Sequence, residues 1–491
     1  MLFEATGREA AAAAGRSRVL TFVRSRGQLL RRLGWGVADQ GMSSLTNFAV
    51  VLFVARELGA TQFGAFSLAY VTYAFALNAS RGLAAYPLQV RFSGAELSAW
   101  RRAVPGSTAT ALSVGIVAGT LVAGAAMLMH GPTRLAFLAL GLTLPGLLLQ
   151  DSWRYAFFSL GRGHLAFLND LTWALAMLPA LLALRAAGNH DVFWYVFAWG
   201  AAAAVAAIVG PFQAKVRPRM SAVRDWVSQH RDLGPRYALS GLTGAGATQL
   251  RAYGIDFFLG LAAVGYVQAA GTLMGPFLII LYGIGLVTVP EAARLLRTSP
   301  RRLPLVCMLV GAVLAAAAAA WGVLLLVALP HGLGNLMLGP IWRPTYPLVL
   351  PQTLFVIAQG LGAGAATGLG ALGAAGRSLR AMIIGSVAYL AFGLTGAAEG
   401  GATGTVIGTA LAAWVSVFVL WWELRGALLA SDIVPAGGRF MSRHESGRHR
   451  RPGHGRPRTR RSGRRPAGQA MARPQGGSGA RHAHRRSSAE T

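Results

Sequence analysis

The sequence predicts an all-α polytopic membrane protein, with about twelve transmembrane helices in two parallel six-helix lobes around a central cavity. Three observations predict this fold class: the composition, the long apolar runs and the distribution of Lys and Arg. Of the 491 residues, 54% are hydrophobic and 13% are charged, and the mean hydropathy is +0.47. Soluble chains of this length are much more polar, so the composition indicates a membrane protein.

Apolar runs of about 20 residues, the length that crosses a hydrocarbon core of about 30 Å, recur along the chain. The runs are continuous and do not alternate between apolar and polar residues, so they predict helices and not barrel strands. The twelve predicted spans are 36–56, 64–85, 104–129, 134–153, 165–186, 193–213, 237–260, 264–289, 304–329, 346–373, 379–397 and 402–423.

The positions of Lys and Arg predict the topology. With both termini in the cytoplasm, the inner segments before the tail hold 24 Lys and Arg, and the outer segments hold only Arg56, Arg134, Arg185 and Arg343. Cytoplasmic loops carry an excess of this kind. We therefore expect an even number of crossings, a cytoplasmic basic segment at 1–34 and a first span that is retained in the mature protein.

The chain divides into two similar halves, 35–213 and 237–424, joined by a basic cytoplasmic linker at 214–236. A Leu-Gly pair followed five residues later by Gly recurs at an offset of 201, and a Pro that closes the second span recurs at an offset of 203. The matching residues are Leu58, Gly59, Gly64 and Pro87 in one half and Leu259, Gly260, Gly265 and Pro290 in the other. Such matches indicate duplication, and copies of six spans each have the same orientation.

The tail, 425–491, has sixteen Arg and almost no aliphatic residues. It cannot bury a core, so we expect it to be disordered in the cytoplasm and attracted to anionic lipid. Aromatic stacking positions do not accompany the Arg residues, which argues against nucleic acid binding. The single cysteine, Cys307, excludes a disulfide within the chain.

Charged residues inside spans are candidates for function, because each costs about 2.5–3.5 kcal/mol at the bilayer centre unless it faces a cavity or a partner. The helical spacing places several polar residues on common faces of spans one, two, seven and eight. We expect these faces to line a hydrophilic cleft between the lobes; the candidates are Asp39, Ser43, Asn47, Asn78, Arg81, Thr248, Arg251, Asp256, Gln268 and Thr272.

A structural alternative stays open for these charges: Asp39 could pair with Arg81, or Arg251 with Asp256, only to neutralise buried charge. Asp170 in span five is closer to the inner end and could reach water. We expect four further charges near span ends to be interfacial, namely Asp151, Arg154, Glu291 and Glu423.

Catalytic, metal-binding and cofactor motifs do not stand out. A membrane polymerase or glycosyltransferase would need a large outer loop or domain, and the longest predicted outer connection runs only from about 330 to 345. The sequence therefore favours transport over catalysis, with a polymerase or glycosyltransferase as the alternative from another class.

Two stretches, Ala38–Phe48 (ADQGMSSLTNF) and Val54–Phe66 (VARELGATQFGAF), resemble the opening of bacterial polysaccharide flippases. These belong to the multidrug, oligosaccharidyl-lipid and polysaccharide (MOP) exporter superfamily, and the similarity covers residues 35 to about 95. The resemblance implies alternating-access movement of a polyprenyl-diphosphate-linked oligosaccharide across the bacterial cytoplasmic membrane. It makes Asp39, Arg81 and Arg251 candidates to bind the headgroup or a coupling cation. The alternative within this superfamily is a cation-coupled multidrug exporter, in which the acids carry the coupling.

Overall fold

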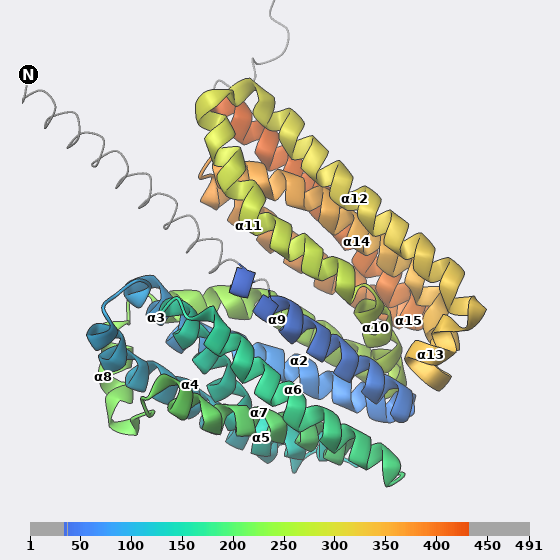
Figure 1. Cartoon of the computed structure of the whole chain (residues 1–491). Coiled ribbons are helices and arrows are strands. Elements are labelled where there is room, and N and C mark those ends of the chain that lie inside the picture. The colour runs from blue at the N-terminus through green and yellow to red at the C-terminus, as the bar shows by residue number, and fades with distance from the viewer. Residues whose placement is uncertain (1–33, 37, 432–491) are drawn as a thin grey trace, which may run out of the picture. The chain divides into compact units, whose positions relative to one another are not determined.

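The computed structural model describes residues 34–36 and 38–431, and every element in this part of the chain is helical. The predictions for the basic N-terminal segment before residue 34 and for the tail beyond residue 431 lie outside the described residues. Figure 1 shows the helices of the first half, drawn in blue to green, and those of the second half, drawn from light green to red. The predicted fold class is confirmed.

Six long helical segments make up the first half. The second segment is continuous but changes its hydrogen-bonding pattern in a π-helical stretch, η1. The segments are Gly34–Glu57; α2 (Ala60–Ser80) with η1 (Arg81–Ala85) and α3 (Tyr86–Phe92); α4 (Leu97–Ala126); α5 (Gly131–Ser159); α6 (Gly163–Ala186); and α7 (Val192–Ala214).

The second half repeats this order after a linker that contains the turn η2 (Met220–Ala222) and the short helix α8 (Val223–Gln229). Its last helix turns back on itself at Gly401, whose φ of 62° lies in the left-handed region that favours glycine. The elements are α9 (Gly234–Leu259), α10 (Leu261–Leu273) with α11 (Gly275–Thr298), η3 (Pro300–Arg302), α12 (Leu303–Ala328), η4 (Leu329–Leu333), α13 (Gly334–Leu338), η5 (Gly339–Ile341), α14 (Trp342–Ala371) and α15 (Ala375–Ala430).

Seven helical stretches in the described part of the chain are long and apolar enough to cross a membrane. Two of them, 300–371 and 375–430, are 72 and 56 residues long. A crossing needs only about 20 residues, so each of these stretches is long enough for two. The seven stretches therefore provide nine crossings. The helical segments α2–α3, α9 and α10–α11 bring the number to twelve.

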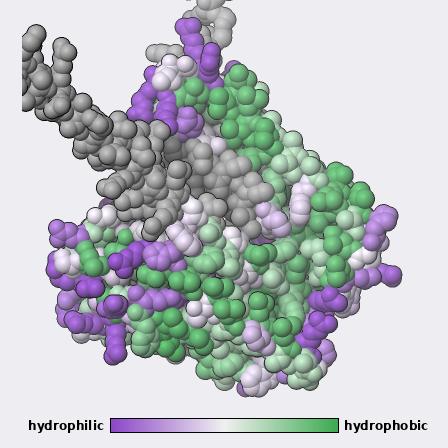
Figure 2. All heavy atoms as spheres, viewed as in Figure 1, coloured by the Kyte–Doolittle hydropathy of each residue, from purple (hydrophilic) through white to green (hydrophobic). Residues whose placement is uncertain are grey.

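Apolar side chains cover the outside of the helices, while hydrophilic side chains gather towards the helix ends (Figure 2). Leu121, Ile208 and Phe212, for example, are 68%, 65% and 71% exposed. In a soluble protein such surfaces would be unfavourable, whereas a bilayer solvates them.

Inside the first half, the rings of Tyr73 and Trp199 pack edge to face at 4.9 Å.

Helix α2 contacts the second half along its length, through α9 and α10. The hydroxyl groups of Thr72 and Tyr253 are 2.8 Å apart, and the Gln249 amide donates to Thr72 at 3.0 Å. These polar contacts link α2 to α9 in the middle of both helices.

Candidate functional site

A polar cavity of about 590 Å³ lies inside the first half. Its wall is formed by the first helix, α2, η1, α3, α5 and α6. The residues that line it are Gly36, Asp39, Gln40, Ser43, Ser44, Asn47, Tyr70, Tyr73, Leu77, Arg81, Tyr86, Gln89, Gln150, Asp151, Arg154, Tyr155, Phe158 and Trp173. Charged groups and aromatic rings therefore share one cavity.

Arg81 makes a two-pronged ion pair with Asp151. Its Nε donates to one carboxylate oxygen at 2.9 Å and its Nη2 to the other at 2.7 Å. The Arg81 side chain is 24% exposed, whereas that of Asp151 is 5% exposed. The guanidinium also lies 5.3 Å from the ring centre of Tyr155. Arg81 is thus held at the edge of the cavity with part of its surface open.

Arg154 binds two further carboxylates. It lies 2.6 Å from Asp39 and 3.1 Å from Asp170, and a third distance, to Asp151, is 3.7 Å. The Gln150 amide donates to Asp170 at 2.7 Å. The side chains of Asp39 and Asp170 are both 1% exposed, so this network is almost entirely removed from solvent.

We call Asp39, Arg81, Asp151, Arg154 and Asp170 the N-terminal charge cluster. When all five groups are ionised, three carboxylates face two guanidinium groups, which leaves one negative charge. One oxygen of Asp39 has no hydrogen-bond partner among the described residues. A buried, unpaired acceptor is costly, so the cluster has both the charge and the ligand atom to attract a cation.

The π-helical stretch that carries Arg81 has a local cause in the sequence. Pro87 has no backbone N–H to donate to the Leu83 carbonyl, and the Tyr86 N–H bonds to the Arg81 carbonyl five residues back. The indole of Trp226 donates to the freed Leu83 carbonyl at 3.1 Å. The widened turn is therefore stabilised by side chains from outside its own helix.

A second contact stabilises the same turn from α4. The Ser107 hydroxyl donates to the Ala84 carbonyl at 3.0 Å. Together with the indole on the other side, this bond fixes the backbone immediately after Arg81. Pro87 thus opens the turn, and packing at the helix end stabilises the π-helical geometry and with it the direction of Arg81.

The structure brings together some of the residues predicted from sequence. Asp39, Ser43, Asn47 and Arg81 all line the cavity. Asn78 does not, since its amide bonds to the Ala74 carbonyl at 2.8 Å. Asp39 and Arg81 do not pair with each other, because each has a partner on α5.

The predicted residues of the second half lie elsewhere. Thr248 lines a separate cavity of about 520 Å³ between α9, α11, α14 and α15, together with Gln359, Tyr389 and the serines Ser378, Ser386 and Ser416. Arg251 lies over the Tyr389 ring at 4.9 Å and makes no ion pair with Asp256. Among the described residues, the charged cavity and the hydroxyl-lined cavity are distinct.

The two remaining candidates, Gln268 and Thr272, interact within α10. The Thr272 hydroxyl donates to the Gln268 carbonyl at 2.9 Å. Both side chains are partly buried, and neither lines the charged cavity.

The expectation that Asp151 and Arg154 are interfacial is wrong. Helix α5 continues to Ser159, beyond the predicted end of the span at 153, and this carries both residues into the bundle. Their spacing of three, with Gln150 and Tyr155 beside them, gives a polar helical face that the sequence contained. Glu423 also differs from the expectation, because it is buried and pairs with Arg377 at 2.9 Å.

Comparisons with known proteins identify the fold. No protein-family profile matches the sequence, and no curated protein matches it. An inward-facing multidrug resistance MATE family transporter of the MOP superfamily matches with a TM-score of 0.63 and 14% identity, covering 80% of this chain and 96% of that chain.

Two further structures have the same architecture. The lipid II flippase MurJ in an inward closed conformation matches with a TM-score of 0.60 and 11% identity, covering 82% of this chain and 91% of that chain. A MOP superfamily transporter from Pyrococcus furiosus matches with a TM-score of 0.53 and 13% identity, covering 82% and 96%. The chain therefore has the fold of these multi-pass membrane transporters.

Proposed function

We propose that this chain, which has the fold of MOP superfamily exporters, moves a polyprenyl-diphosphate-linked oligosaccharide across the cytoplasmic membrane by alternating access, coupled to a cation. The N-terminal charge cluster carries the proposal, because it combines an excess carboxylate with a partly exposed arginine in one cavity. The cluster lies on four segments, the first helix, η1, α5 and α6, so binding there affects the packing of the half as a whole.

The cation step follows from the charge balance. A proton or a metal cation on one of the three acids removes the excess negative charge of the cluster. Asp39 offers an oxygen that has no hydrogen-bond partner among the described residues, and the cation competes with Arg154 for the Asp39 carboxylate. Binding of the cation weakens the Asp39–Arg154 ion pair, which joins the first helix to α5.

The cargo step uses the guanidinium of Arg81. Arginine donates in a fork that fits a phosphate group, but Asp151 occupies this fork in the structure. Once the cation releases Arg154 from Asp39, Arg154 can pair with Asp151, which already lies 3.7 Å away, and Arg81 is then free to bind a diphosphate in the cavity. A cavity of about 590 Å³ has the size of a small-molecule site, which suits a headgroup and its first sugar but not the lipid chain.

The nature of the cargo rests on the resemblance of residues 35–95 to polysaccharide flippases. The fold likeness to a lipid II flippase supports a lipid-linked cargo. In this proposal Arg251, which lies over Tyr389 and lines neither cavity, donates to the headgroup at a different stage of its passage from Arg81.

The test is transport in reconstituted vesicles, with a labelled lipid-linked sugar and an imposed proton or sodium gradient. We expect Asp39→Asn to abolish the response to the gradient, and the double variant Arg81→Ala, Arg251→Ala to abolish translocation. Glu291→Gln is the matched control, because Glu291 is 70% exposed in its pair with Arg294. Translocation that survives in the double variant would overturn the role of the arginines.

A second candidate function is a cation-coupled multidrug exporter. It is favoured by the negative excess of the cluster and by aromatic rings in the same cavity, among them Tyr70, Tyr86, Tyr155 and Trp173. Aromatic faces and a carboxylate bind organic cations. Efflux of a cationic dye by the vesicles, without flipping of the lipid-linked sugar, would support this function in place of the first.

A further inference from the structure

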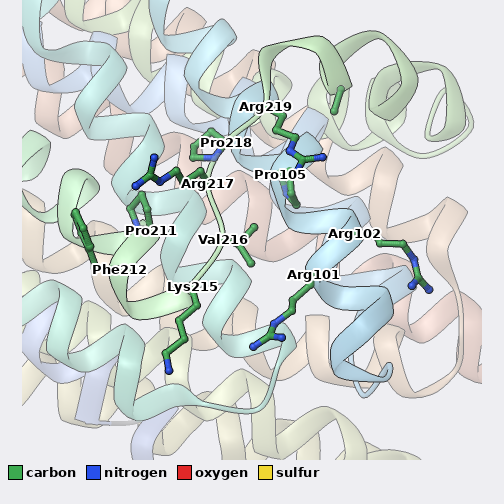
Figure 3. A pocket seen from close by; sticks show the side chains of 11 residues that line it. Arg101, Arg102, Pro105, Pro211, Phe212, Lys215, Val216, Arg217, Pro218 and Arg219 are labelled. Carbon is green, nitrogen blue, oxygen red and sulfur yellow. The ribbon is translucent and has the colours of Figure 1, made fainter.

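A groove of about 950 Å³ lies at the end of the first half where α7 ends and α4 begins. It is separate from the charge cluster and shares no lining residue with that cavity. Figure 3 shows the side chains around it. They are Arg101, Arg102, Pro105, Pro211, Phe212, Lys215, Val216, Arg217, Pro218, Arg219 and Ala222.

The groove combines five cations with no acid in its lining. All five cationic side chains are exposed, and none forms an ion pair with another described residue. The nearby Arg91 differs, because it pairs with Asp232 at 2.8 Å. The positive charge of the groove is therefore not neutralised within the part of the chain that the structure describes.

The backbone holds these cations together. Lys215 has a φ of 54° and is the only non-glycine residue with positive φ among the described residues. This conformation ends α7 sharply and turns the chain across α4, where the Arg219 N–H donates to the Pro105 carbonyl at 3.1 Å. The turn brings Arg217 and Arg219 into the lining of the same groove as Arg101, which belongs to α4.

An exposed apolar stripe on α7 leads away from the groove. Val205, Ile208 and Phe212 are 46%, 65% and 71% exposed, and their spacing of three and four puts them on one helical face. Phe212 is also part of the groove lining. A ligand in the groove thus meets a cationic surface at the helix ends and an apolar surface along the helix.

We propose that this groove binds an anionic phospholipid of the surrounding membrane, with a headgroup that carries two phosphates. Basic pockets between transmembrane helices at the cytoplasmic side bind headgroups of this class. The five cations are more than enough to neutralise two phosphates, and the stripe through Phe212 lies where an acyl chain would extend. A soluble anion, in contrast, contacts only the cationic lining of the groove and not the apolar stripe on α7.

The test is native mass spectrometry of the full chain in detergent, titrated with diphosphatidylglycerol, phosphatidylglycerol or phosphatidylethanolamine. We expect the triple variant Lys215→Gln, Arg217→Gln, Arg219→Gln to weaken diphosphatidylglycerol binding about 100-fold, because each cation near an anionic lipid raises the affinity about fivefold. The matched control is Arg224→Gln, Arg231→Gln, Arg236→Gln, which removes the same charge from exposed residues of the same linker outside the groove. We expect the control to change binding no more than a few-fold.

Two further arms separate the possible sources of the phosphate. Phe212→Ala should weaken phospholipid binding several-fold and leave binding of inorganic diphosphate unchanged. This variant still tests the proposal if the triple variant does not fold. Equal losses in the two triple variants would overturn the proposal, because the attraction would then belong to the charged surface in general. Displacement of the phospholipid by equimolar inorganic diphosphate would overturn it as well, since the apolar stripe would then contribute nothing.

Discussion

Gly64 in α2 and Gly265 in α10 face each other's backbone across the contact between the two halves. A Cβ atom on Gly64 would overlap the Leu261 carbonyl, and one on Gly265 would lie 2.8 Å from the Ala60 carbonyl oxygen. The two glycines are the equivalent positions of the internal repeat, at an offset of 201. The repeated Leu-Gly…Gly pattern therefore marks a place where the backbones of the two halves approach closely.

This contact predicts a graded response to an added methyl group. We expect Gly64→Ala to lower the free energy of unfolding by about 1–3 kcal/mol or more, as overpacking does, and Gly265→Ala to lower it less. Gly124→Ala is the control in α4, because nothing lies within 4 Å of its Cβ position. Thermal unfolding in detergent measures the series, and a control as destabilised as Gly64→Ala would contradict it.

The three acids around one guanidinium predict a large cost for removing Arg154. Breaking a buried ion pair by deleting one partner costs about 3–5 kcal/mol, and we expect Arg154→Gln to fall in this range. Arg91→Gln breaks an exposed pair with Asp232 and should cost less than about 1 kcal/mol. Adding Asp170→Asn to Arg154→Gln should recover part of the stability, and melting temperatures that do not separate Arg154→Gln from Arg91→Gln would contradict the prediction.

The π-helical turn predicts that Pro87 matters for transport more than for stability. In Pro87→Ala a backbone N–H returns, so an ordinary α-helical bond to Leu83 can form and Arg81 turns away from Asp151. We expect an unchanged or higher melting temperature but a loss of vesicle transport of about tenfold or more. Pro105→Ala, in the next helix, is the control, and full transport by Pro87→Ala would show that the widened turn is dispensable.

The linker predicts a pH dependence outside the membrane-spanning segments. His230 stacks on Trp226 at 3.9 Å and contacts the Trp226 carbonyl through Nδ1 at 2.8 Å. Burial lowers the pKa of His230 from its ordinary value of 6.5. The unfolded linker therefore binds a proton more readily, so the stability that His230 contributes is present above pH 6.5 and is lost as the pH falls below it.

Hydrogen exchange of residues 220–230 measures this effect. We expect the protection of α8 in the natural protein, relative to His230→Gln at the same pH, to fall between pH 7.5 and pH 5. If the difference between the two proteins stays constant over this range, His230 is not the responsible group.

Hydropathy and charge were sufficient to predict the fold class, because each membrane span must satisfy its own backbone and therefore appears as a continuous apolar run. The same reasoning placed Asp39 and Arg81 on polar faces, and both line the charged cavity. The sequence could not show that their partners are on α5. An ion pair between residues 115 positions apart, such as Asp39 and Arg154, leaves no local pattern.

The missed residues have two physical causes. A hydropathy window ends where charges begin, which places Asp151 and Arg154 at the interface. Helix α5 continues to Ser159 because charges on other segments neutralise both residues inside the bundle. The direction of Arg81 depends on a bond from Trp226 to Leu83, which is a tertiary contact. Arg251 is grouped with Arg81 as a charge on a polar face of a span, but its neighbour Tyr389 lies on α15.

The hydroxyl-lined cavity of the second half contains no carboxylate in its lining, although its helices follow the same order as those of the first. The two halves therefore share the order of their helices but not the buried charge at these two sites. An ion that enters the acidic cavity changes the electrostatic energy of the first half and not that of the second half. The two halves therefore respond unequally to ion binding.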